Sequence, residues 1–134
     1  MLTIKIVEDG TASAKEMGVS LLPGAEVMEV RDGQLLMGIG VMRLFDNFAV
    51  IDDICMKEEF KEFTLEYGLG KSLLNVVDLR GIRFVFSDNE NIEKQLRALK
   101  FKAPSELEDA SQYPPEILPH RLCLCLDGYF LAKC

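Results

Sequence analysis

The chain has 134 residues, of which 49% are hydrophobic and 28% are charged, a composition typical of a globular domain and not of a disordered segment. Its formal net charge of −7 argues against a nucleic-acid partner, since phosphate contacts require a basic face. No apolar run reaches the length of a membrane span, and the first residues lack the layout of a signal peptide. We therefore expect one domain over residues 1–134, a cytoplasmic location and no membrane partner.

The first half of the chain predicts an antiparallel meander. Strand-like runs recur between turn signals, at residues 2–7, 26–31, 34–45 and 48–56. Residues 11–22 predict at most one short helix, which ends at Pro23-Gly24. Asp32-Gly33 predicts a tight hairpin turn between the second and third strands.

The second half predicts strands that alternate with helices. Helices are expected at 70–79 and 90–99, and strands at 82–86, 121–126 and 129–132. A polar, proline-bearing loop is expected between the last helix and the last strands. A meander followed by strand–helix–strand–helix predicts an α+β fold with a central mixed, mostly antiparallel sheet flanked by helices.

Residues 67–72, with the sequence YGLGKS, predict a glycine-rich turn that leads into a helix. Glycine lets the backbone approach a ligand, and a helix start exposes N–H groups and the positive end of the helix dipole. This pattern favours a site for phosphate or pyrophosphate. A Walker loop is excluded because Leu65 stands where its first glycine is required. A dinucleotide fingerprint is excluded because Leu73 replaces its third glycine.

The four cysteines, Cys55, Cys123, Cys125 and Cys134, lack the spacing of a disulfide framework. Cys123 and Cys125 are two apart in a strand-like run, so both should face the same side. They could form a metal or redox pair, but we favour two small apolar side chains in a buried strand. His120 is the only histidine, and one histidine with a Cys-x-Cys pair does not complete a zinc site. We expect no metal.

The order of these elements, with the glycine segment at the start of the central helix, resembles the GNAT (GCN5-related N-acetyltransferase) family from about residue 26 to residue 101. The meander 26–56 resembles the second to fourth strands of the family. Residues 67–72 resemble its pyrophosphate loop, and the segment that begins at Asn89 resembles its last conserved helix. The resemblance implies a GNAT-like acyl-CoA N-acyltransferase fold with a shortened acceptor-side region at 8–24.

The resemblance further implies that acetyl-CoA or CoA binds and that the acyl group passes to a small amine or a lysine. The strand edge would pair with the pantetheine arm, and the glycine turn would hold the pyrophosphate. The cofactor-binding residues implied in this way are Ile54, Cys55, Met56, Tyr67, Gly68, Leu69, Gly70, Lys71, Ser72 and Asn89.

The chain also departs from the family. The general-acid tyrosine that is frequent on the last helix falls at Leu96, and the connector 57–66 is long and acidic, so that it would repel a pyrophosphate. Amine acylation needs a base. Asp52 and Asp53 are the acidic residues on the strand beside the implied thioester, and alternation places them on opposite faces. We take Asp53, which shares a face with Cys55, as the candidate catalytic base.

Three hypotheses stay open. The leading one is a divergent acyl-CoA-dependent N-acetyltransferase. The second is a GNAT-fold module that binds CoA without catalysis. The third is an interaction domain whose exposed strand edge, expected after residues 121–132, could pair with a second copy in a homodimer.

Overall fold

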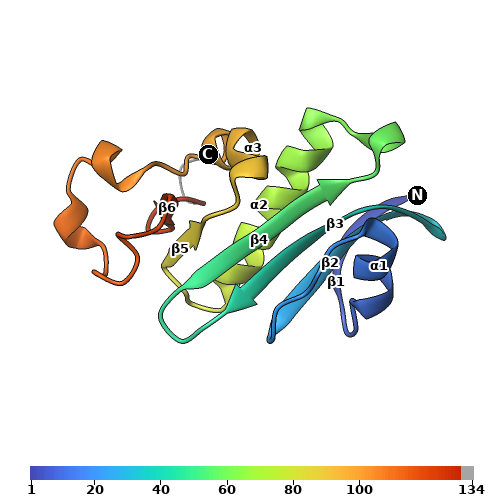
Figure 1. Ribbon diagram of the computed structural model, residues 1–134, viewed down its shortest axis with the longest axis horizontal. Coiled ribbons are helices and arrows are strands. Elements are labelled where there is room, and N and C mark those ends of the chain that lie inside the picture. Colours follow the sequence, from blue (N-terminus) through green and yellow to red (C-terminus); the bar gives the residue numbers. More distant parts are fainter. Residues whose placement is uncertain (131–134) are drawn as a thin grey trace.

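A six-stranded sheet with the strand order β1-β2-β3-β4-β5-β6 forms the centre of the computed structural model, which describes residues 1–130 (Figure 1). Its strands are β1 (Leu2–Val7), β2 (Ala25–Asp32), β3 (Leu35–Leu44), β4 (Ala49–Met56), β5 (Phe84–Ser87) and β6 (Leu122–Cys125). All neighbouring strands are antiparallel except β4 and β5, which run parallel. The predicted α+β class, with a mixed and mostly antiparallel sheet, is confirmed.

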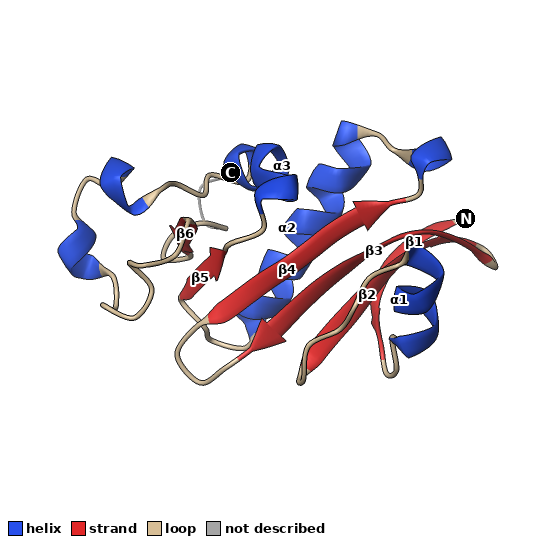
Figure 2. Ribbon diagram, in the orientation of Figure 1, coloured by secondary structure: helices blue, strands red, loops and turns tan. Residues whose placement is uncertain are grey.

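The α-helices are α1 (Thr11–Met17), α2 (Phe63–Leu79) and α3 (Glu93–Ala98). Short 3-10 turns lie at η1 (Glu58–Phe60), η2 (Glu90–Ile92), η3 (Pro104–Glu106) and η4 (Ala110–Gln112). Figure 2 shows α1 and α2 on opposite faces of the sheet. Within residues 1–130, no helix combines the length and the apolar character needed to cross a membrane.

The larger core lies between the sheet and α2. Four side chains form one stripe of α2 and are fully buried: Leu69, Leu73, Leu74 and Val77. They pack with Met42 of β3 and with Ile51 and Ile54 of β4 in one cluster. Gly40 of β3 permits this approach, because a Cβ there would lie 2.8 Å from Leu73 Cδ1.

Two smaller cores lie on the other face. Helix α1 covers β2 and β3 through a cluster of buried residues: Ala14, Val27, Leu36, Ile39 and Val41. The segment before β6 covers the end of β4 and β5, where Val50, Phe86, Ile117 and Cys123 are buried together. Leu122 and Leu124 pack in the α2-side core, so Cys123 and Cys125 share the opposite face of β6, as predicted.

Helix α2 begins at Phe63 and not at Gly70, so the predicted start of this helix was wrong. A glycine inside a helix costs only about 1 kcal/mol relative to alanine, and burial of the apolar stripe of α2 outweighs that cost. The strand expected at 129–132 was also wrong where it can be judged, since Tyr129 and Phe130 lie in a turn. The rest of that strand, and Cys134, lie outside the described residues.

The outer side of the edge strand β6 is paired at one residue, Cys123. The Lys102 amide donates to the Cys123 carbonyl at 3.0 Å, and the Cys123 amide donates to the Lys102 carbonyl at 2.8 Å. The strand edge that was expected to pair in a homodimer is therefore covered at Cys123, while β1 forms the other edge of the sheet. The homodimer itself stays a prediction.

Candidate functional site

Strands β4 and β5 are paired over a short stretch and then separate. Ala49 pairs with Val85 and Val50 with Phe86. Beyond these pairs, β4 continues to Met56 with no strand of the described chain on that side. The parallel pair thus leaves an opening in the sheet beside the second half of β4.

A β-bulge lies at the start of this opening. The register between β3 and β4 shifts so that Asp52 has no partner on β3. Ile51 and Ile54 both pack in the core beneath α2, so the two residues between them project from the opposite face. The prediction that Asp52 and Asp53 face opposite sides was therefore wrong, because the bulge interrupts the alternation of side chains along the strand.

Side chains from the segment after Phe86 take the place of a paired strand at the opening. The Ser87 hydroxyl donates to the Ile51 carbonyl at 2.7 Å, and Asn89 Nδ2 donates to the Asp52 carbonyl at 2.9 Å. Asn89 Oδ1 also accepts from the Asn91 amide at 2.9 Å, which makes Asn89 an N-cap as well as a neighbour of β4. The cap and the position beside the opening are compatible in this geometry.

Asp53 and Cys55 lie next to the bulge on the α1 side. Burial raises the pKa of Asp53, and the charge of Asp52 raises it further. The Ile54 amide, which donates to Asp53 Oδ1 at 2.9 Å, lowers this pKa but does not outweigh the other two effects. Burial also raises the pKa of the Cys55 thiol, with a further contribution from Asp53. Because the thiolate is the reactive form, this environment disfavours Cys55 as a nucleophile.

A cavity of about 390 Å³ adjoins the bulge on the same side of the sheet. Its lining combines aromatic rings with charged and polar groups: Arg43, Phe45, Phe48, Val50, Ile51, Asp52, Phe86, Asp88, Asn89 and His120. Arg43 donates to both carboxylate oxygens of Asp52, with Nε–Oδ2 at 2.7 Å and Nη2–Oδ1 at 2.9 Å. This bidentate bond raises the pKa of Arg43. The volume and the mixed lining are typical of small-molecule sites.

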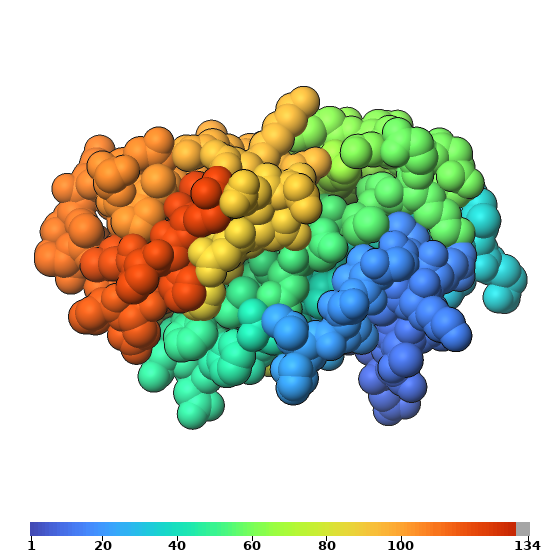
Figure 3. Space-filling model, viewed as in Figure 1, coloured from blue at the N-terminus to red at the C-terminus, as the bar shows by residue number. Residues whose placement is uncertain are grey.

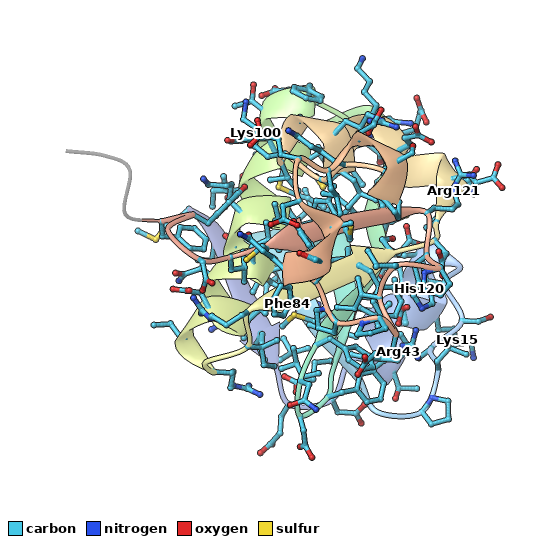
Figure 4. The ribbon with its side chains drawn as sticks, turned by 90° about the vertical axis from the view of Figure 1, so that its left-hand side faces the viewer. Lys15, Arg43, Phe84, Lys100, His120 and Arg121 are labelled. Carbon is cyan, nitrogen blue, oxygen red and sulfur yellow. The ribbon has the colours of Figure 1, made fainter. Side chains whose placement is uncertain are left out.

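The cavity also contains a histidine–aspartate pair. His120 Nδ1 lies 2.7 Å from Asp88 Oδ2, and the Arg121 amide donates to Asp88 Oδ1 at 2.8 Å. The His120 ring stacks on Phe86 with centroids 3.6 Å apart and planes 12° apart. Burial alone would raise the pKa of Asp88, but the hydrogen bonds from Arg121 and His120 outweigh it and the pKa is lowered. Figure 4 shows His120 and Arg43 on the side of the molecule that carries Lys15 of α1.

Sequence reasoning did not find this pair. It considered His120 only as a part of an incomplete zinc site, and the two partners are 32 residues apart. Asp88 follows a predicted strand and has no sequence feature that links it to His120. No local pattern in the sequence signals that Asp88 and His120 meet.

The glycine segment does not form a phosphate-binding turn. Residues 67–72 lie inside α2, where each backbone amide donates to the carbonyl four residues earlier. The Ser72 hydroxyl donates to the Gly68 carbonyl at 2.9 Å. Gly70 is buried, and a Cβ there would lie 2.5 Å from Leu99 Cδ1. The predicted turn was therefore wrong, and Gly70 serves the contact between α2 and the end of α3.

Lys71 lies among aromatic rings. Its Nζ is 4.7 Å from the ring centroid of Tyr129, 5.1 Å from that of Phe130 and 5.8 Å from that of Tyr67, a cation–π arrangement. The Tyr129 hydroxyl donates to the Leu99 carbonyl at 2.8 Å, and burial raises its pKa to about 12. Tyr129 is thus poorly suited to protonate a leaving group.

The N-terminal end of α2 is acidic. Glu58, Glu59 and Glu62 are exposed there, and Glu66 is buried, where its Oε1 accepts from Gln95 Nε2 at 3.1 Å. Negative side chains favour a helix N-terminus, which helps α2 to start at Phe63. The same charges oppose a bound phosphate.

The fold of the chain matches those of solved acetyltransferases, whereas no family model and no curated protein matches it. The spermidine/spermine N-acetyltransferase SpeG from Vibrio cholerae matches with a TM-score of 0.68 at 12% identity, over 99% of both chains. Tetrahymena GCN5 matches with a TM-score of 0.66 at 11% identity, over 93% of this chain and 94% of that one. A GNAT family acetyltransferase from Elizabethkingia anophelis with acetyl-CoA bound matches with a TM-score of 0.58 at 12% identity, over 92% and 94%. The chain therefore has a divergent form of the GNAT fold.

Proposed function

We propose that the protein is an acyl-CoA-dependent N-acyltransferase that transfers an acetyl group to a primary amine, either a small molecule or a lysine side chain. The observation that carries the proposal is the coincidence of three features at one place. The β4–β5 pairing ends there, β4 bulges at Asp52, and a small-molecule-sized cavity opens beside it. This is where a thioester in the sheet opening and an amine in the cavity would meet.

The strand edge supports an extended donor. A pantetheine arm carries amide groups that can hydrogen-bond a free strand edge as an added strand does. Ser87 and Asn89 occupy the carbonyls of Ile51 and Asp52, and the pantetheine amides would continue this pairing along residues 54–56. The relative from Elizabethkingia anophelis holds acetyl-CoA, which supports this class of donor for the shared fold.

The charge of the protein supports a cationic acceptor. A net charge of −7 attracts ammonium groups over long distances. The reaction removes a proton from the ammonium, after which the amine nitrogen attacks the thioester carbon, the C–S bond breaks and the CoA thiolate takes up a proton. Asp53 is the base that the sequence suggests, and its raised pKa makes it more basic than an ordinary aspartate.

A second candidate is a module that binds an acyl-CoA or a protein without chemistry. It is favoured by the position of residues 67–72 inside α2 and by the buried Glu66, which leave the pyrophosphate without the expected cradle. Leu96, at the position of the frequent tyrosine, is fully buried and has no proton to donate. This candidate predicts ligand binding without turnover.

Calorimetric titration with acetyl-CoA and CoA, followed by a thiol-release assay with a panel of primary amines, tests both candidates. The informative variant is Asn89→Asp, which keeps an N-cap but loses the amide donor and adds a charge at the opening. Asn91→Asp is the matched control, because it adds the same charge at an exposed neighbour.

Acetyl-CoA binding that weakens about tenfold, or about 1.4 kcal/mol, in Asn89→Asp and not in Asn91→Asp supports a donor at this opening. Amine-dependent thiol release then supports the transferase. Binding without release for every amine supports the binding module. No binding at millimolar acetyl-CoA contradicts the transferase and the acyl-CoA-binding module, and leaves a module that binds a protein.

A further inference from the structure

We propose that His120 is the catalytic base that deprotonates the acceptor amine, and that Asp88 is its positioning residue. The inference rests on the proposed transferase function and adds to it a base that the sequence did not suggest. It depends on three observations. His120 is hydrogen-bonded to Asp88, the His120 ring stacks on Phe86, and this ring lines the cavity.

The contact with Asp88 determines which ring nitrogen is free. A carboxylate only accepts hydrogen bonds, and Asp88 is held in its charged form by the Arg121 amide and His120, which lower its pKa. His120 Nδ1, at 2.7 Å from Asp88 Oδ2, therefore carries a proton and donates it to this bond. In the neutral ring Nε2 is then the unprotonated nitrogen that can accept a proton.

Stacking keeps the ring in place. The His120 ring lies 3.6 Å from the Phe86 ring and nearly parallel to it, and Phe86 is itself buried in a strand of the sheet. A ring held on one face by Phe86 and at Nδ1 by Asp88 has little freedom to rotate. Such fixed orientation is what a general base requires.

The cavity places this base next to the bulge. His120 lines the same cavity as Asp52 and Asn89, the residues at the sheet opening. Figure 3 looks onto this α1 side, where β3 and β4 lie between α1 and the segment that leads into β6. An amine in the cavity would therefore contact His120 on one side and the opening on the other.

The other charged residues that line this cavity, Arg43 and Asp52, are paired with each other by their bidentate bond. Next to His120 in the chain, Arg121 Nη2 bonds Glu93 Oε1 at 2.7 Å. The His120–Asp88 pair is thus the second polar pair that lines this cavity.

Asp53 is less well placed for the same step. It is not among the residues that line the cavity, and its Oδ1 accepts from the Ile54 amide. In the proposed step, Nε2 of His120 takes a proton from the ammonium, and the free amine attacks the thioester carbon. As the C–S bond breaks, the amine nitrogen loses its second proton and the thiolate gains one. The net products are an amide, a thiol and one proton released to solvent.

The kinetic test compares two forms of the protein, wild type and His120→Gln, with benzylamine, spermidine and a lysine-containing peptide as probe amines. The wild type should show kcat/KM that rises with pH through the ionisation of a general base. His120→Gln should lower kcat by about 10²- to 10⁴-fold and remove that ionisation, as expected for loss of a general base. A His120→Gln protein that retains both kcat and the ionisation, with an unchanged melting temperature, overturns the proposal.

A second measurement does not depend on turnover. Because the sequence contains one histidine, its ring protons can be followed by NMR without assignment of the rest of the protein. Asp88→Asn keeps the shape and the acceptor for the Arg121 amide but removes the carboxylate that accepts the Nδ1 proton. The chemical shifts of the ring protons should therefore change, and Glu90→Gln, a neighbouring exposed charge, should change them less. An equal shift in both variants contradicts the pairing.

These results distinguish a failure of the transferase function from a failure of His120 as its base. No thiol release from wild-type protein with any amine overturns the transferase and the catalytic role of His120 together. Thiol release that survives in His120→Gln with its pH profile intact overturns the base alone and leaves the transferase standing.

Discussion

The two ends of the opening beside β4 differ in the chemistry that they offer. At the α2 end, the backbone amides of residues 67–72 are used within the helix, and glutamates surround its N-terminus. At the cavity end, Arg43–Asp52 and His120–Asp88 form two oriented pairs around a space of about 390 Å³. Both ends are well ordered by packing, but within the described residues only the cavity end combines polar groups that are suited to a reaction.

The comparison shows that the opening between β4 and β5 can form without a phosphate-binding turn at the start of α2. The strand order and the separation of β4 from β5 depend on the packing of apolar side chains, which does not require a phosphate site. Any affinity for an acyl donor must then come mainly from the strand edge and the cavity. Four predictions examine this difference between the two ends.

The largest effect is expected for Gly70→Ala at the α2 end. The new Cβ would lie 2.5 Å from Leu99 Cδ1, so the buried Leu99 side chain must shift. Overpacking of this kind costs about 1 to 3 kcal/mol, which the preference of a helix for alanine reduces by about 1 kcal/mol. Urea denaturation should show this loss in the free energy of unfolding. Unchanged stability would indicate that Gly70 is not needed for packing and would reopen a role in ligand binding.

Gly68→Ala is the matched substitution two residues away and should act in the opposite direction. No heavy atom lies within 4 Å of a Cβ built there, and alanine is favoured over glycine in a helix interior by about 1 kcal/mol. The same denaturation experiment should show a gain in the free energy of unfolding. A loss would mean that residues 67–72 do not have a helical backbone in solution, which would remove the contrast between the two ends.

Asp53→Asn should give a smaller gain in stability, confined to higher pH. A carboxyl group whose pKa is raised in the folded protein stabilises the fold while it is protonated, and stability falls as pH rises through the folded pKa. Burial raises the pKa of Asp53, and asparagine keeps the acceptor for the Ile54 amide without the charge. Melting temperatures at pH 4 and pH 7 should therefore differ less in the variant than in the wild type. A lower melting temperature for the variant at pH 7 would contradict this.

The smallest effect is expected when the donor is shortened from acetyl-CoA to acetyl-pantetheine. Without a cradle for the pyrophosphate, the nucleotide end should contribute less than a factor of about ten in kcat/KM, or about 1.4 kcal/mol. Parallel thiol-release assays with the two donors measure this ratio. A much larger loss for the short donor would show that a pyrophosphate site exists at the α2 end after all.

Local patterns were sufficient for most of the elements and for the fold class. Alternation and turn residues predicted β1 to β4 within a residue or two, because each of these signals lies within the strand or its adjoining turn. The glycine pair misled because the cost of glycine in a helix is small relative to the burial of Leu69 and Leu73.

The sequence by itself therefore determined the approximate positions of β1 to β6, the presence of the central helix but not its start, and the α+β arrangement. These follow from which residues are apolar and how they are spaced. Only the tertiary structure decided the chemistry of the site. The bulge that turns Asp52 and Asp53 to one face arises from the pairing of β3 with β4. The meeting of Asp88 with His120 arises from a loop that folds back over β5. Both depend on contacts between segments far apart in the chain, which local spacing does not encode.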